Sequence, residues 1–179
     1  MLFRSEHQGG DDGRYAVQDD GTVVVAADSL PLRCIDATVD GKGPVECILD
    51  SGSQIVAIRK EVWVSLGIPI RSDKIMMMEA ANKTKSATMG VLENLPVSIG
   101  PVNLRLQVQV MQDAPYDMLL GRPFYSLAEC VTRDFSSGDQ YITMKDPNTG
   151  EEIMLPTRGR TRKRAVPGSQ QDFQVLRSR

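Results

Sequence analysis

The sequence predicts a single all-β domain, either a barrel or a sandwich. Short apolar segments recur along the middle of the chain, and turn-forming residues separate them at close intervals. Helical periodicity is confined to one or two turns. At 179 residues the chain has room for one domain with loose ends, and not comfortably for two.

The first half of the domain predicts three short strands and a short helix. Leu32–Val39 runs into a glycine-rich turn, and Val45–Leu49 returns as an apolar strand. Ile55–Ile58 is the next strand, after an Asp-Ser-Gly turn. Residues 59–66 predict one or two helical turns, which end at Gly67, a typical C-terminal cap.

The second half predicts a hairpin followed by further strands. Ile75–Glu79 and Thr88–Leu92 are the expected arms of the hairpin, with a polar tip between them. In 104–110, apolar and polar residues alternate, which indicates a half-buried strand. The last expected strands, joined by connectors rich in turn formers, are Val131–Phe135, Gln140–Lys145 and Glu152–Leu155.

The two ends of the chain differ in composition from its middle. Residues 1–28 are rich in Gly, Asp and Gln, which predicts a mostly disordered segment. Residues 157–179 carry seven basic residues against one acidic residue, whereas the remainder has 14 basic and 22 acidic residues. We therefore interpret 157–179 as a disordered basic tail and 29–156 as the folded domain.

The composition argues against several functional classes. The three cysteines lie far apart without a C-x-x-C spacing, which indicates neither a disulfide framework nor a zinc site. The single histidine, His7, lies in a polar N-terminal stretch, which argues against Ser-His and Cys-His catalysis. The chain has no apolar run of membrane-spanning length and no signal-peptide core. We expect an intracellular, cytoplasmic protein that uses no membrane, metal or cofactor.

One strand delivers a carboxylate at a tight turn. The second expected strand leads directly into Asp50-Ser51-Gly52, where the glycine leaves space for a close backbone approach and the serine hydroxyl can hold the loop. Taken alone, this is common turn chemistry. A second motif, Asp117–Phe124, follows the alternating strand some 67 residues later and contains Leu-Leu-Gly-Arg.

The two motifs together resemble the signature of the retropepsins, and specifically of the protease segments of fungal gypsy-type LTR retrotransposon polyproteins. In that family, a hydrophobic-hydrophobic-Asp-Ser-Gly segment is followed by hydrophobic-hydrophobic-Gly-Arg. The resemblance covers roughly residues 32–156. It implies a closed β-barrel with a flap hairpin and one or two short helices, active as a two-fold dimer that works as an aspartic endopeptidase.

The resemblance also implies roles for particular residues. Asp50 would be the catalytic aspartate, and the Ser51 hydroxyl would bond across to the loop of the other subunit. Gly121 would close the strand and turn that pack beneath Asp50. The flap would span about 75–92. The residues expected to support the loop are Ser51, Gly52, Ser53 and Gly121, and those expected at the flap tip are Ala81, Asn82 and Lys83.

Elementary chemistry supports the dimer independently of the resemblance. Hydrolysis by carboxylates needs one group to deprotonate water and another to protonate the carbonyl oxygen. The chain holds a single Asp-Ser/Thr-Gly motif, so a two-fold axis is the simplest way to bring two Asp50 side chains together. The expected partners are a second copy and an extended polypeptide substrate held by main-chain hydrogen bonds. We expect the late strands, 131–155, to supply part of the dimer interface.

Three functions follow as hypotheses. The first is an endopeptidase that matures a retroelement polyprotein, and the second is a non-catalytic retropepsin-like dimerisation module. The third is a weak nucleic-acid contact through 158–164, although a solvated linker is the favoured interpretation of that charge run. We also expect the Ser53 hydroxyl to donate to an Asp50 oxygen, with a bond to local backbone as the alternative.

Overall fold

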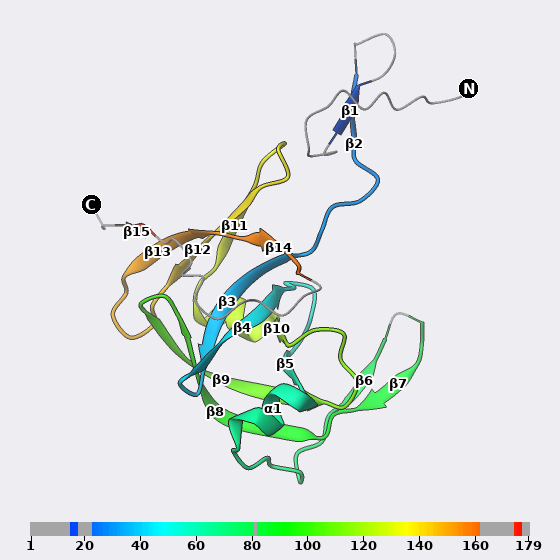
Figure 1. Ribbon diagram of the computed structural model, residues 1–179, viewed down its shortest axis with the longest axis vertical. Helices are drawn as coiled ribbons and strands as arrows, with labels where there is room; N and C mark the ends of the chain where they lie inside the picture. The colour runs from blue at the N-terminus through cyan, green and yellow to red at the C-terminus, as the bar shows by residue number, and fades with distance from the viewer. Residues whose placement is uncertain (1–14, 18–22, 81, 162–173, 177–179) are drawn as a thin grey trace.

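The computed structural model describes residues 15–17, 23–80, 82–161 and 174–176, and its centre is a closed barrel of six strands (Figure 1). Around the barrel the strands follow the order β3, β4, β10, β5, β9 and β8, and β8 pairs again with β3. Their bounds are β3 Arg33–Val39, β4 Lys42–Leu49, β5 Val56–Arg59, β8 Gly90–Ile99, β9 Val102–Met111 and β10 Met118–Leu120. The predicted all-β class with a closed barrel is therefore confirmed.

Strand β9 shows how the sequence pattern builds the barrel. Leu104, Leu106 and Val108 are buried, whereas Arg105 and Gln107 between them are exposed. Because successive side chains of a strand point to opposite faces, this alternation turns one face of β9 into the core. The half-buried strand that the alternation predicted is present.

Strand β10 joins segments that are distant in the sequence. It is parallel to β4, with Leu120 opposite Leu49, and antiparallel to β5, with Met118 opposite Ile58. Its insertion between β4 and β5 brings the C-terminal ends of β4 and β10 to the same place. Asp50 directly follows β4 at that place.

Two short helices flank the barrel strands. Helix α1, Lys60–Leu66, ends at Gly67, which has a left-handed φ of 70° and donates its N–H to the Val64 carbonyl. This confirms the predicted glycine cap. Helix α2, Arg122–Leu127, begins directly after Gly121. Neither helix in the described ranges has the length and apolar character that crossing a bilayer requires.

The flap is a separate two-stranded hairpin formed by β6, Met77–Glu79, and β7, Lys85–Ala87. Its second arm ends at Ala87, so the predicted arm Thr88–Leu92 was placed too late in the chain. At Gly90 the backbone has a φ of 143° and approaches Arg71 so closely that an added Cβ would lie 2.5 Å from the Arg71 carbonyl oxygen. The chain leaves the flap there and enters β8.

A second, four-stranded sheet follows the barrel in the order β11, β12, β13 and β15. Its strands are β11 Val131–Asp134, β12 Gln140–Lys145, β13 Glu152–Pro156 and β15 Gln174–Leu176. Near the other end of the chain, β1, Tyr15–Val17, pairs with β2, Val24–Ala26. The rest of the expected disordered segment, 1–28, lies mostly outside the described residues.

Residues 157–161, which we call the strap, correct the predicted domain boundary. Thr157 is buried, and β14, Arg158–Gly159, pairs with β3. The Arg158 guanidinium forms ion pairs with Asp36 and Glu46, so charges that suggested a solvated tail are neutralised on the barrel. The expected disorder from Thr157 therefore fails for the strap, while 162–173 and 177–179 lie outside the described residues.

Candidate active site

The backbone of the loop after β4 fixes the Asp50 carboxylate. The Asp50 N–H donates to the Leu120 carbonyl at 3.1 Å, which ties the loop to β10. Within the loop, the Ser53 N–H donates to the Asp50 carbonyl at 3.1 Å, and the Gly52 N–H donates to Asp50 Oδ1 at 3.0 Å. Asp50 is nevertheless exposed. The loop thus presents an oriented carboxylate at the surface of the single chain.

Gly121 supports this loop through its lack of a side chain. A Cβ built at Gly121 would lie 2.0 Å from the Ile55 carbonyl oxygen and 2.7 Å from that of Ser53. Both atoms belong to the backbone, so only glycine fits without displacing the loop. The next residue, Arg122, donates its N–H to the Ser53 carbonyl at 2.8 Å. The Leu-Leu-Gly-Arg motif therefore packs against the Asp50 loop.

The serines beside Asp50 differ in their surroundings. Ser51 is exposed, and its hydroxyl makes no hydrogen bond within the described part of the chain. The Ser53 hydroxyl donates to the Ile55 carbonyl at 3.2 Å and accepts from the Ile55 N–H at 3.4 Å. The expected bond from Ser53 to an Asp50 oxygen is therefore not formed in this structure, and the alternative of a local backbone bond is.

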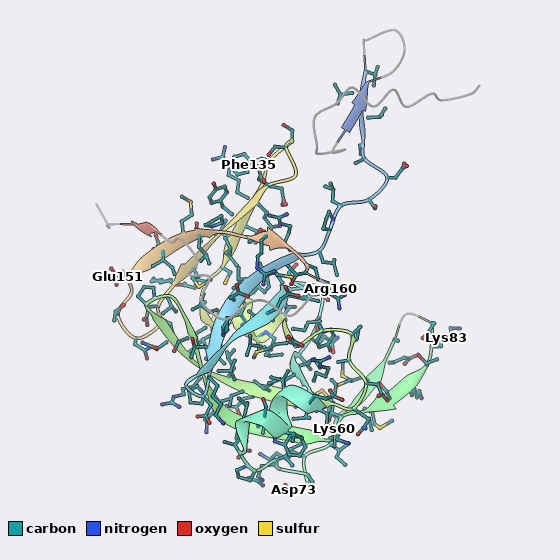
Figure 2. The ribbon with its side chains drawn as sticks, in the orientation of Figure 1. Lys60, Asp73, Lys83, Phe135, Glu151 and Arg160 are labelled. Atoms are coloured by element: carbon teal, nitrogen blue, oxygen red, sulfur yellow. The ribbon has the colours of Figure 1, made fainter. Side chains whose placement is uncertain are left out.

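The flap tip forms a defined turn. Asn82 Oδ1 accepts hydrogen bonds from the N–H and the hydroxyl of Thr84, while Lys83 has a left-handed φ of 62° and donates its N–H to the Ala80 carbonyl. Ala81 lies outside the described residues. Figure 2 shows Lys83 at the free end of the hairpin, away from the barrel. Asn82 and Lys83 form no hydrogen bond or ion pair with Asp50 within the described part of the chain.

Two tyrosines that the sequence reasoning missed lie within electrostatic reach of Asp50. Burial raises the pKa of Tyr125 to about 12, and the charges of Cys130 and Asp50 add to the effect. Burial, followed by the charge of Asp50, also raises the pKa of Tyr116. Tyr125 follows Gly121 by one helical turn, and its N–H donates to the Gly121 carbonyl at 3.3 Å. The spacing of one helical turn between Gly121 and Tyr125 is the feature of the sequence that could have indicated the position of Tyr125.

Two hollows lie near the flap and the helix α1, and neither is lined by Asp50. One, of about 700 Å³, lies at the base of the flap between Ile75, Met77 and Gln107. The other, of about 620 Å³, is lined by Tyr116 and Thr161 among others.

The site thus consists of an exposed aspartate held by a loop at the junction of two barrel strands, with a glycine packed against that loop. A family model described as "Aspartyl protease" matches residues 35–124, half of the chain. The chain belongs to the aspartyl protease family. The matched range contains both the Asp-Ser-Gly loop and the Leu-Leu-Gly-Arg motif.

Solved structures with a similar fold include a retroviral protease-like domain and a retropepsin-like aspartic protease. One is the retroviral protease-like domain of Ddi1 from Leishmania major, at 17% identity and a TM-score of 0.47, covering 57% of this chain and 82% of that one. The other is a retropepsin-like aspartic protease from Rickettsia conorii, at 19% identity and a TM-score of 0.44, covering 69% and 83%. No curated protein sequence matches the chain.

Proposed function

We propose that the protein is an aspartic endopeptidase whose active site forms between two copies of the chain, each contributing Asp50. The observation that carries the proposal is the Asp50 loop itself. The backbone orients one exposed carboxylate, and the described chain offers no second Asp-Ser-Gly loop to complete a dyad. Membership of the aspartyl protease family supports the same chemistry.

The proposed mechanism uses the two Asp50 carboxyl groups in different protonation states. Two carboxyl groups close together share one proton, which is the known behaviour of aspartic protease dyads. The ionised group takes a proton from a water molecule, which attacks the peptide carbonyl carbon, while the protonated group donates to the carbonyl oxygen. Proton transfer to the amide nitrogen then allows the C–N bond to break.

The proposed substrate is an extended polypeptide. In the dimer it would lie between the flap hairpins and the Asp50 loops, bound by main-chain hydrogen bonds in the manner of an added strand. The biological role that we propose is maturation of a retroelement polyprotein. It rests on the resemblance of the paired motifs to protease segments of gypsy-type retrotransposons.

Substitution of the carboxylate tests the function directly. Asp50→Asn should reduce peptide cleavage by at least about 10³-fold, because the amide cannot act as the general base. The fold and the dimer should persist, since the side chain is exposed and the Gly52 N–H can still donate to the amide oxygen. Cleavage of a peptide library by purified wild-type and variant proteins measures this, with pepstatin as the inhibitor control.

Mixing the wild-type and Asp50→Asn proteins distinguishes an active site shared by two chains from one formed within a single chain. If wild-type and Asp50→Asn chains exchange freely at equal amounts, activity per wild-type chain should fall to about half, because mixed dimers hold one carboxylate. Unchanged activity per wild-type chain would contradict a shared dyad. A wild-type dimer that cleaves no peptide would instead favour the non-catalytic dimerisation module.

A further inference from the structure

Gln109 is a buried polar residue on the face of β9 where Arg105 and Gln107 are exposed. Only 9% of the Gln109 surface is exposed. The base of the flap lies against β9 at this point, since the Met89 N–H donates to the Val110 carbonyl at 2.8 Å. Burial of a polar side chain is costly unless its groups are hydrogen-bonded. The position of Gln109 therefore requires a partner from the flap base.

Thr88 is that partner, and its hydroxyl joins three segments of the chain. The hydroxyl donates to Gln109 Oε1 at 3.0 Å and accepts from the Met76 N–H, also at 3.0 Å. The Thr88 N–H donates in turn to the Met76 carbonyl at 2.9 Å, and only 2% of Thr88 is exposed. Met76 directly precedes β6 and Thr88 directly follows β7, so both arms of the flap meet β9 here. We call Met76, Thr88 and Gln109 the flap tie.

On the barrel side of the flap tie, the backbone fixes the chain. Arg71 and Val91 exchange hydrogen bonds of 2.9 and 3.2 Å, and the close approach of Gly90 to Arg71 leaves no room for a side chain. The ion pairs of Arg71 and Lys74 with Glu93 lie at the exposed surface, where such pairs stabilise a fold only weakly. The Arg71–Val91 pair therefore forms the base from which the two arms of the flap extend.

Beyond the flap tie, few apolar side chains of the flap are buried. Met77 exposes 65% of its surface, and all three residues of β7 are exposed. Figure 1 shows the β6–β7 hairpin projecting away from the barrel strands. The hollow of about 700 Å³ lies beside Ile75 and Met76, which are 56% and 41% exposed. Hydrogen bonds at the flap base therefore contribute more than apolar packing to holding the arms at the barrel.

We propose that Gln109 is a positioning residue, which holds the flap in its substrate-binding orientation through the Thr88 hydroxyl. The inference rests on the proposed function, in which the flap covers an extended polypeptide. When the bond between Thr88 and Gln109 breaks, the two arms stay joined at Met76 and Thr88. The hairpin then rotates as one unit about the Arg71–Val91 pair, and the substrate loses one wall of its binding site.

The flap tie acts on substrate binding and leaves the chemical step to Asp50. When only a fraction of the molecules hold the flap in the tied orientation, the apparent affinity for substrate falls by that fraction. A bound substrate itself selects the tied orientation, so the chemical step in the complex is unchanged. Loss of the tie should therefore raise KM and leave kcat and its pH dependence as they are in the wild type.

Two glutamine substitutions on β9 test the proposal. Gln109→Met removes the acceptor for the Thr88 hydroxyl and keeps the side-chain length, so KM for a cleaved peptide should rise about threefold or more, with kcat changed less than about twofold. Gln107→Met is the matched control, because Gln107 lies on the same face but bonds Asn94 at the β8 bulge. Its KM should equal the wild-type value. An equal rise of KM in both variants overturns the assignment.

Amide hydrogen exchange measures the flap tie without any substrate. The Met89 N–H donates to Val110 beside the tie, so it should exchange about threefold faster or more in Gln109→Met and at the wild-type rate in Gln107→Met. Residue-resolved exchange by NMR measures this, with the other amides of β9 as the internal reference. Unchanged exchange at Met89 in a folded Gln109→Met protein overturns the proposal.

Substitution of Thr88 separates the effect of its hydroxyl from that of its packing. Thr88→Val keeps the branched shape and removes the hydroxyl, so it should raise KM and speed exchange at Met89 as Gln109→Met does. Exchange at Met76 should also become faster, because its N–H loses its acceptor. Thr88→Ser should restore the wild-type values. Combining Thr88→Val with Gln109→Met should raise KM no further than either change alone, since both act through one bond.

The outcomes distinguish this inference from the proposed function. A wild-type protein that cleaves no peptide, but whose Met89 amide exchanges faster in Gln109→Met than in Gln107→Met, supports the flap tie and contradicts the protease proposal. Cleavage in which Gln109→Met lowers kcat and leaves KM unchanged overturns the positioning role and leaves the protease proposal standing. If Thr88→Val does not fold, the two glutamine variants decide the question by themselves.

Discussion

The Ser53 hydroxyl shows that the nearest backbone groups can determine the hydrogen-bond partners of a side chain beside a candidate catalytic group. Sequence reasoning directed it toward Asp50, where it would stabilise the ionised carboxylate. In the structure it bonds the carbonyl and the N–H of Ile55 instead, two residues along the chain. Serine hydroxyls in turns commonly make such local bonds. Ser53 is therefore a residue that shapes the loop.

Substitution of Ser53 should leave the pH dependence unchanged. Ser53→Ala removes bonds of 3.2 and 3.4 Å within the loop, which should lower the free energy of unfolding by about 1 kcal/mol or less. The acid limb of a kcat/KM profile should stay where it is in the wild type, because no bond to Asp50 is lost. An acid limb displaced to higher pH would show that the hydroxyl turns toward Asp50 in the working enzyme.

The strap is the element for which the prediction from the sequence differs most from the structure. Arg33 donates to both the hydroxyl and the carbonyl of Thr157, and the Thr157 hydroxyl donates to the Gln140 carbonyl. Arg158 bonds Asp36 and Glu46 at 2.6 and 2.5 Å. These contacts link the barrel to the second sheet. Removing the chain from Thr157 onward should therefore weaken the domain, contrary to the expectation from composition.

The Arg158 ion pairs should contribute measurably to stability. Arg158→Ala leaves two carboxylates that are only 10% and 14% exposed without their shared cation, so the free energy of unfolding should fall by about 2 kcal/mol at neutral pH. The exposed Arg160 is the matched control, because its backbone bond to Leu32 survives Arg160→Ala. Urea unfolding of the two variants measures the difference.

The effect of Arg158→Ala should also depend on pH. Burial alone would raise the pKa of Glu46, but hydrogen bonds from Thr161 and Arg158 outweigh burial and hold it below its ordinary value of 4.5. A lowered folded-state pKa adds stability above about pH 4.5, which is lost as pH falls through the folded value. The difference in the free energy of unfolding between Arg158→Ala and the wild type should therefore become smaller as the pH falls through this range. A difference that stays constant to pH 3 would contradict this role of Glu46.

At the scale of the whole molecule, the proposed two-chain site makes activity depend on assembly. If the dyad forms only between chains, specific activity must fall on dilution below the dimer dissociation constant, since each released monomer exposes a single Asp50. Activity per chain, measured over a thousandfold dilution at fixed substrate, should follow the dimer fraction from sedimentation. Constant activity per chain in a range where only monomer sediments would contradict the two-chain site.

The sequence by itself determined the all-β class, several strand segments, the Gly67 cap and the pair of motifs around Asp50 and Gly121, and it left a barrel and a sandwich both open. These features are local. The alternation of apolar and polar residues sets which face of a strand is buried, and a glycine marks a place where the backbone leaves no room for a side chain or adopts a conformation that other residues avoid. The family match confirms the class of protein that the two motifs predicted. The role of Asp50 remains a prediction for the experiments above.

The tertiary structure alone decided which distant segments meet. Strand β10 lies between β4 and β5, Arg33 reaches Thr157 across 124 residues, and Tyr125 comes within the field of Asp50. The strap looked like a solvated tail because its charges were counted without Asp36 and Glu46 beside them. Local pattern cannot show such pairings, because their stability comes from partners that only chain closure brings into contact.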